Sequence, residues 1–95
     1  MITNHLLIKL KTQNLTDAEK AKAHLLGMKG KIGVLAGIQV ELDIRHSAAS
    51  YDLLLITRFA TMEDMEVYLA HPVHLEVSKY IAEVMEASAS VCFEE

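Results

Sequence analysis

The alternation of apolar and polar residues is clearest between Ile38 and Ile44, where Gln39, Glu41 and Asp43 separate the apolar positions. This period of two predicts a β-strand. Three further strands are predicted over 2–11, 51–59 and 88–94. The first of them carries apolar residues on both alternation phases, which indicates a strand that is covered on both faces.

Between these strands, apolar residues recur at helical spacing. The first helix is predicted over 17–29, where Thr16 opens a capping box and Gly30 follows as a stop signal. A second helix is predicted after Thr61, and it ends before Pro72 because proline pushes the preceding residue out of the helical region. Proline also suits the first position of a helix, so a third helix is predicted to begin there and to run to about residue 84.

The predicted order is therefore strand, helix, strand, strand, helix pair, strand. This β-α-β-β-α-β order predicts an α+β fold of the ferredoxin-like type, with a four-stranded antiparallel sheet and helices on one face. The 95 residues fit one domain over 1–95. Hydrophobic residues make up 52% of the chain, so we expect the second sheet face to be covered by another copy, in a homodimer.

Composition limits the classes of partner that we expect and indicates a cellular compartment. The formal net charge is -4 and the lysines are dispersed, whereas a nucleic-acid-binding surface needs a dense positive patch. Cys92 is the only cysteine, which excludes an intrachain disulfide and a cysteine-based metal cluster. No apolar run approaches the ~20 residues of a membrane helix, and no signal-peptide pattern is present. We expect a cytoplasmic protein without nucleic-acid or membrane partners.

Four separate segments resemble one known family. The stretch YLAHPVHLEVSKYI (68–81) is similar to the Y-x-x-H-P-x-H motif of the stress-responsive dimeric α/β-barrel proteins. The opening MITNHLLIKLK, MKGKI (28–32) and SYDLLLITRF (50–59) resemble segments of the same family in the same order. The resemblance implies two ferredoxin-like subunits whose sheets pack into a barrel, each subunit with a pocket between its sheet and its helices.

The resemblance also implies candidate catalytic residues. One plant relative, a polyketide cyclase that makes olivetolic acid, uses a tyrosine and a histidine of this motif as an acid–base pair, and the matching positions are Tyr68 and His74. The chain departs from the family in its first strand, where Asn4 occupies the position of a common histidine. His5 follows it and points to the opposite face of the strand. An asparagine can orient a polar ligand, but it does not exchange a proton near neutral pH.

The local sequence supports the same acid–base pair on physical grounds. With Pro72 as the first helical residue, His71 lies at the N-cap and His74 in the first turn, where the helix dipole disfavours an imidazolium. A neutral His74 can accept a proton from an acidic carbon or a phenol, and Tyr68 can donate to a carbonyl. The alternative is structural: a capping His71, a hydrogen-bonded His74 and a Tyr68 whose hydroxyl lies at the surface. Because spacing places no third ligand beside the two histidines, we expect no metal.

These observations predict a largely apolar, cofactor-free pocket in each subunit. Its residues are predicted to be Asn4, Leu6 and Ile8 on the floor, Leu25 and Met28 on a wall, and Tyr68, His71 and His74 as polar groups. The predicted function is binding, with cofactor-independent acid–base conversion, of a small aromatic or polyketide-like ligand by a cyclase- or isomerase-like protein. Two alternatives stay open: a non-catalytic stress-responsive binding protein, and a cofactor-free monooxygenase or haem-handling protein.

Overall fold

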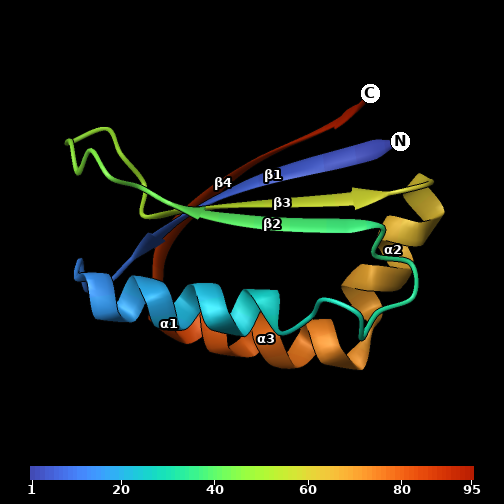
Figure 1. Cartoon of the computed structure of the whole chain (residues 1–95), viewed down its shortest axis with the longest axis horizontal. Helices are drawn as coiled ribbons and strands as arrows, with labels where there is room; N and C mark the ends of the chain where they lie inside the picture. The colour runs from blue at the N-terminus through green and yellow to red at the C-terminus, as the bar shows by residue number, and fades with distance from the viewer.

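A computed structural model of the chain describes residues 1–95 and contains one sheet with a layer of helices on one side (Figure 1). Its elements are, in order, β1 (Ile2–Leu10), α1 (Leu15–Leu26), β2 (Gly37–Leu42), β3 (Leu53–Phe59), α2 (Met62–Ala70), α3 (Pro72–Val84) and β4 (Met85–Glu94). All neighbouring strands are antiparallel and the strand order is β2-β3-β1-β4. The predicted ferredoxin-like α+β fold is confirmed, and its second helical segment is the predicted pair of helices.

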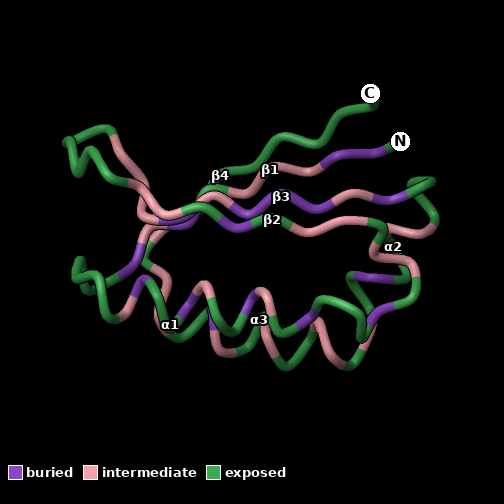
Figure 2. Tube along the Cα trace, viewed as in Figure 1, coloured by how far each residue is buried: buried purple, intermediate pink, exposed green.

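The register of β1 and β3 determines which side chains face the helices. Asn4 lies opposite Thr57 and Leu6 lies opposite Leu55, and directly opposed residues of an antiparallel pair share a face. Ile8 belongs to the same row and is fully buried. In Figure 2 the buried residues concentrate on β1, β3 and the inward turns of the helices. The hydrophobic core therefore lies between the central strands and the helix layer.

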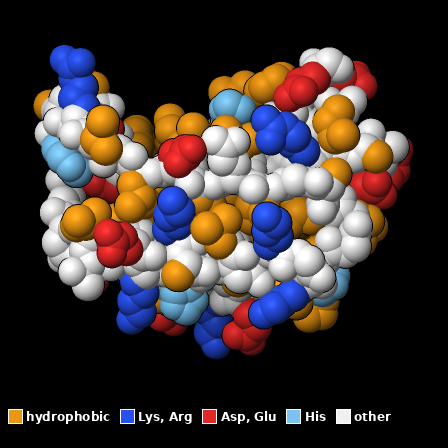
Figure 3. Space-filling model, in the orientation of Figure 1, with side chains coloured by type: hydrophobic (Ala, Val, Ile, Leu, Met, Phe, Trp, Pro, Cys, Tyr) orange, Lys and Arg blue, Asp and Glu red, His pale blue; other side chains and the backbone are white.

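The opposite face of the sheet carries no helix (Figure 1). Leu7, Val91 and Phe93 are 38%, 65% and 41% exposed there. The ring of His5 lies 5.4 Å from that of Phe93, so this histidine is on the open face, as predicted. Together with Leu54 these side chains line a hollow of about 450 Å³. Figure 3 shows hydrophobic side chains gathered in the depression along the upper edge of the molecule, on this side of the sheet.

The start of α1 differs from the prediction. The helix begins at Leu15, and its N-cap is Asn14, whose side chain accepts a hydrogen bond from the Asp17 backbone N–H at 2.8 Å. The predicted capping box at Thr16 is wrong because Thr16 already lies inside the helix. Asparagine is among the strongest N-cap residues and ranks above threonine, so the earlier start satisfies the first turn with the better cap.

Two other boundaries are also shifted. α1 ends at its C-cap Gly27, whereas Gly30 adopts a positive φ of 78° in the following turn. β4 starts at Met85, directly after α3, and not at residue 88. It pairs with β1 from Leu10 to Ile2, so strand pairing extends β4 beyond the apolar segment from which it was predicted. None of the helices has the length and apolarity that crossing a lipid bilayer demands.

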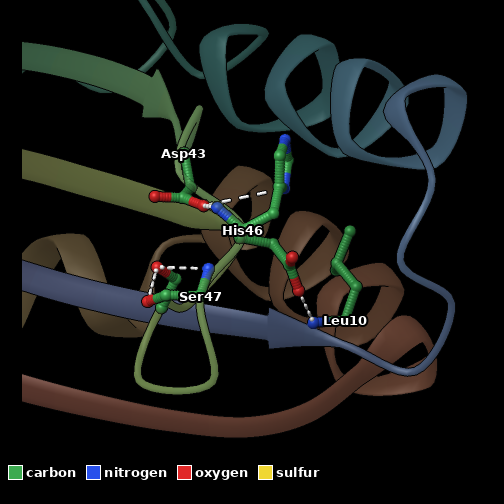
Figure 4. Close-up of polar contacts among 6 residues, drawn as sticks. Leu10, Asp43, His46 and Ser47 are labelled. Carbon is green, nitrogen blue, oxygen red and sulfur yellow. Dashed lines mark hydrogen bonds and ion pairs between the residues drawn. The ribbon is translucent and has the colours of Figure 1, made fainter.

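The loop between β2 and β3, residues 43–52, replaces the predicted ends of both strands. The backbone N–H of Leu10 donates to a carboxylate oxygen of Asp52 at 2.7 Å, and that of His46 donates to Asp43 at 2.7 Å (Figure 4). His46 adopts a positive φ of 54°, which ends any extended conformation. Ile44 lies in this loop, outside the sheet, and is 90% exposed.

Candidate functional site

A pocket of about 110 Å³ lies between the helix face of the sheet and the helices. The structure brings together in its lining all of the sequence-predicted site residues except His71. These residues are Asn4, Leu6, Ile8, Leu25, Met28, Tyr68 and His74. They come from β1, from α1 and the turn after it, from α2 and from α3, so segments far apart in the sequence converge on one cavity.

The floor of the pocket follows the pairing of β1 with β3. Asn4 and Thr57 form one polar cross-strand pair, and Leu6 and Leu55 form the next, apolar pair two residues further along. Ile8 continues this row into the core. The floor therefore changes from polar to apolar along the strands.

Tyr68 lies near the end of α2, beside the polar end of this floor. It is only 4% exposed, and its ring packs against Phe59, with 5.0 Å between the ring centroids. Burial raises the pKa of the phenol to about 12. Tyr68 is therefore protonated at neutral pH and can donate a hydrogen bond into the pocket.

His74 lies in the first turn of α3, with its ring centroid 4.4 Å from that of Tyr68. Its Nδ1 is 3.0 Å from the backbone carbonyl oxygen of Leu69. Because a carbonyl oxygen can only accept, Nδ1 carries the proton and Nε2 of the neutral ring keeps a free lone pair. Burial lowers the pKa of His74, and the bond to the Leu69 carbonyl partly offsets this effect. The neutral state predicted from the helix terminus thus has burial as its main cause.

His71 occupies a different place from the other predicted residues. It links α2 to α3 in an extended conformation, and its Nδ1 accepts a hydrogen bond from the Val73 backbone N–H at 3.1 Å. It does not line the pocket. His71 is the N-cap of α3, which matches the structural alternative given for it above.

The sequence matches the family model of the stress-responsive A/B barrel domain over residues 2–94. The chain belongs to this family. Within the barrel-domain motif, Tyr68 and His74 enter the pocket, whereas His71 and Pro72 form the joint between the two helices. No curated protein matches the chain at a significant level.

Solved structures agree with this family assignment. A dimeric protein of unknown function with a ferredoxin-like fold from Bacteroides fragilis is 25% identical, with a TM-score of 0.85 over 99% of this chain and 95% of its own. A dimeric ferredoxin-like protein of unknown function from Thermobifida fusca is 20% identical, with a TM-score of 0.85 over 99% of this chain and 90% of its own. The hydroxynitrile lyase of Passiflora edulis is 12% identical, with a TM-score of 0.83 over 97% of this chain and 90% of its own. The last two likenesses concern the fold alone.

Sequence reasoning missed part of the pocket of this barrel domain. The missed lining residues are Leu55, Thr57, Leu69, Val77, Ser78 and Ile81. A period of two along the third predicted strand places Leu55 and Thr57 on one face, so the strand contained a signal for these two residues. The helical spacing of Val77 and Ile81 indicates one apolar side of α3, but that this side borders the pocket depends on how the helix packs on the sheet. Nowhere in the structure do three His, Cys, Asp or Glu side chains come together in an arrangement suited to a metal ion.

Proposed function

We propose that this barrel-domain protein binds a small carbonyl compound in its pocket and catalyses proton transfer at the carbon next to the carbonyl, without a cofactor. One observation carries the proposal: Tyr68 and His74 line the same pocket with their ring centroids 4.4 Å apart. The tyrosine is a protonated donor, and the histidine is neutral with a free Nε2. These are the two groups that enolisation of a ketone requires.

The proposed step is a single proton transfer. Nε2 of His74 takes a proton from the α-carbon, so the C–H bond breaks and its electron pair moves into a C=C bond. The π electrons of the carbonyl move onto its oxygen, which accepts a hydrogen bond from the Tyr68 hydroxyl. Return of the proton to carbon regenerates the ketone, while attack of the enolate carbon on a second carbonyl of the same ligand would close a ring. Enolisation is therefore common to an isomerase and to a cyclase of the aldol type.

Deuterium exchange tests this step without knowledge of the natural substrate. Acetophenone is incubated with the purified protein in D₂O, and loss of the methyl proton signal is followed by NMR. We expect exchange faster than in buffer alone, because each reversal of proton transfer delivers a deuteron to carbon. Binding of acetophenone without faster exchange would contradict the catalytic proposal and favour the non-catalytic alternative.

The exchange rate is expected to fall at acidic pH. Only neutral His74 can act as the base, and burial holds its pKa below the usual 6.5. The protein-dependent rate should thus be half-maximal at the lowered pKa, level off within about one pH unit above it, and decline at lower pH. Ionisation of Tyr68 affects the rate only near pH 12. Rates measured between about pH 4.5 and 9, after subtraction of the buffer rate, check this profile. A midpoint above 6.5 would exclude His74 as the base.

We also propose that the protein is a homodimer formed through the open sheet face. Val91 and Phe93 line an apolar hollow on this face and are 65% and 41% exposed. A second copy packed on this face would remove both side chains from water. The relative from Bacteroides fragilis is described as dimeric, which supports a dimer. Two such faces in contact would form the barrel for which the family is named.

Val91→Asp is expected to weaken this dimer by about 100-fold or more, since an unpaired charge buried in an apolar contact costs several kcal/mol. Val67→Asp is the matched control, because Val67 is 53% exposed on α2, in the helix layer. Analytical ultracentrifugation over a range of concentrations measures both variants against the wild type. A monomeric wild type, or equal weakening by both substitutions, would rule out the open face as the interface.

A further inference from the structure

The pocket is polarised along its length. At one end lie the Asn4–Thr57 pair, Tyr68 and His74. Two residues further along the strands, about 7 Å away, the Leu6–Leu55 pair begins an apolar stretch. A ligand that matches this lining has its polar atoms at one end and hydrocarbon at the other.

The polar groups at this end are free to bind a ligand. Thr57 is 1% exposed, and neither its hydroxyl nor the Asn4 amide takes part in a side-chain hydrogen bond within the chain. No enclosed polar side-chain atom is left without a partner, so the Thr57 hydroxyl reaches open space. That space is the pocket, because Thr57 is part of its lining.

The lining contains no aspartate, glutamate, lysine or arginine. At a pH at which His74 is neutral, an ionised ligand would therefore lose hydration inside the pocket and gain no opposite charge in return, a cost of several kcal/mol. The neutral donors Asn4 and Thr57 can satisfy a carbonyl or hydroxyl oxygen, whereas a carboxylate or phosphate needs a charged partner.

The volume limits the size of the ligand. The pocket measures about 110 Å³. An engineered apolar cavity of about 150 Å³ is known to accept benzene. The pocket is smaller than that cavity, so one ring is the most that it encloses, and an extended polyketide chain or a haem macrocycle does not fit.

We infer that the Asn4–Thr57 pair is the oxygen-binding end of the pocket and that its ligand is an uncharged carbonyl or hydroxyl compound about the size of one six-membered ring. The inference rests on the proposed function for the pocket and narrows its substrate class. It assigns to Thr57, which the sequence analysis did not single out, the role of distinguishing an oxygenated ligand from a hydrocarbon. Along the strands, the ring of the ligand lies over Leu6 and Leu55.

NMR titrations with a matched pair of compounds test the inference that the ligand is uncharged. Benzamide and benzoate have the same shape and differ in charge. At a pH well above the pKa of His74 we expect benzoate to bind at least 10-fold more weakly, because its carboxylate meets no cation. Shifts of the Asn4 and Thr57 backbone amides in the ¹⁵N-labelled protein locate the binding. Equal affinity for the two compounds, or binding of both elsewhere, would overturn the inference.

Thr57→Val tests the oxygen-binding role while keeping the β-branched shape. We expect the affinity for acetophenone to fall between about 2-fold and 10-fold, the range of one hydrogen bond, and the affinity for toluene to stay unchanged. Thr57→Ser, which keeps the hydroxyl, should bind acetophenone like the wild type. Equal loss for acetophenone and toluene would show a change of packing and overturn the role of Thr57.

The titrations and the exchange assay can reject this inference and the proposed catalysis independently of each other. Selective binding of neutral compounds without deuterium exchange would reject the proposed catalysis and leave this inference intact. Exchange accompanied by equal binding of benzoate and benzamide would reject the inference and leave the catalysis. Failure of all four compounds to bind would reject both.

Discussion

His74→Asn is expected to lower the rate of protein-catalysed deuterium exchange by about 10²- to 10⁴-fold, the usual contribution of a positioned general base. Asparagine can still donate a hydrogen bond in the direction of the Leu69 carbonyl, which lies 3.0 Å from His74 Nδ1 in the wild type. It offers no basic nitrogen in place of Nε2. The substitution therefore removes the base and keeps a polar group near the Leu69 carbonyl.

Two further variants complete this test. His46→Asn is the matched control, because His46 lies on the exposed β2–β3 loop, and its exchange rate should equal that of the wild type. Tyr68→Phe keeps the aromatic packing against Phe59 and removes the donor to the enolate oxygen, a change that costs about 10²- to 10³-fold in comparable sites. Unchanged circular dichroism confirms that each variant is folded. A decrease of less than 10-fold for His74→Asn would show that another group is the base.

Phe59→Ala is expected to cost about 3–5 kcal/mol of folding free energy. Phe59 is fully buried, pairs with Ile2 across the sheet and supports the ring of Tyr68, with 5.0 Å between their ring centroids. A domain of 95 residues has a total stability of about 5–14 kcal/mol, so this cavity removes a large share of it. The same substitution removes the support of Tyr68, and ligand affinity should fall in the fraction that stays folded.

Urea denaturation at a single protein concentration measures this loss, since the apparent stability of a dimer depends on concentration. Phe59→Leu is the control, because it keeps much of the volume and should cost less than about 1.5 kcal/mol. A loss below that value for Phe59→Ala would mean that the core closes around the missing ring.

Local patterns in the sequence determined the elements and their order. Alternation predicted the strands, and Pro72 located the break between the last two helices because its ring excludes the helical conformation at His71. Alternation also placed Asn4 and His5 on opposite faces of β1, as the structure confirms. Element order then determined the ferredoxin-like fold, since few topologies bury the apolar faces of these elements.

The sequence prediction was wrong at two element boundaries, the start of α1 and the end of β2. Asparagine and threonine both suit the N-cap position, and the structure has Asn14 there, with Thr16 inside the helix. The strand predicted to reach Ile44 stops at Leu42, and a turn follows in which the Asp43 carboxylate accepts from the His46 backbone N–H.

The sequence by itself therefore determined the fold class. The resemblance of its histidine-proline motif singled out Tyr68 and His74, which line one pocket. Only the tertiary structure decided that Thr57 joins Asn4 in the pocket, that His71 stays outside it, and that the lining holds no charge. The physical reason is that periodicity is a local property, whereas strand register and helix packing depend on contacts between residues far apart in the chain. The pocket is built from these distant contacts.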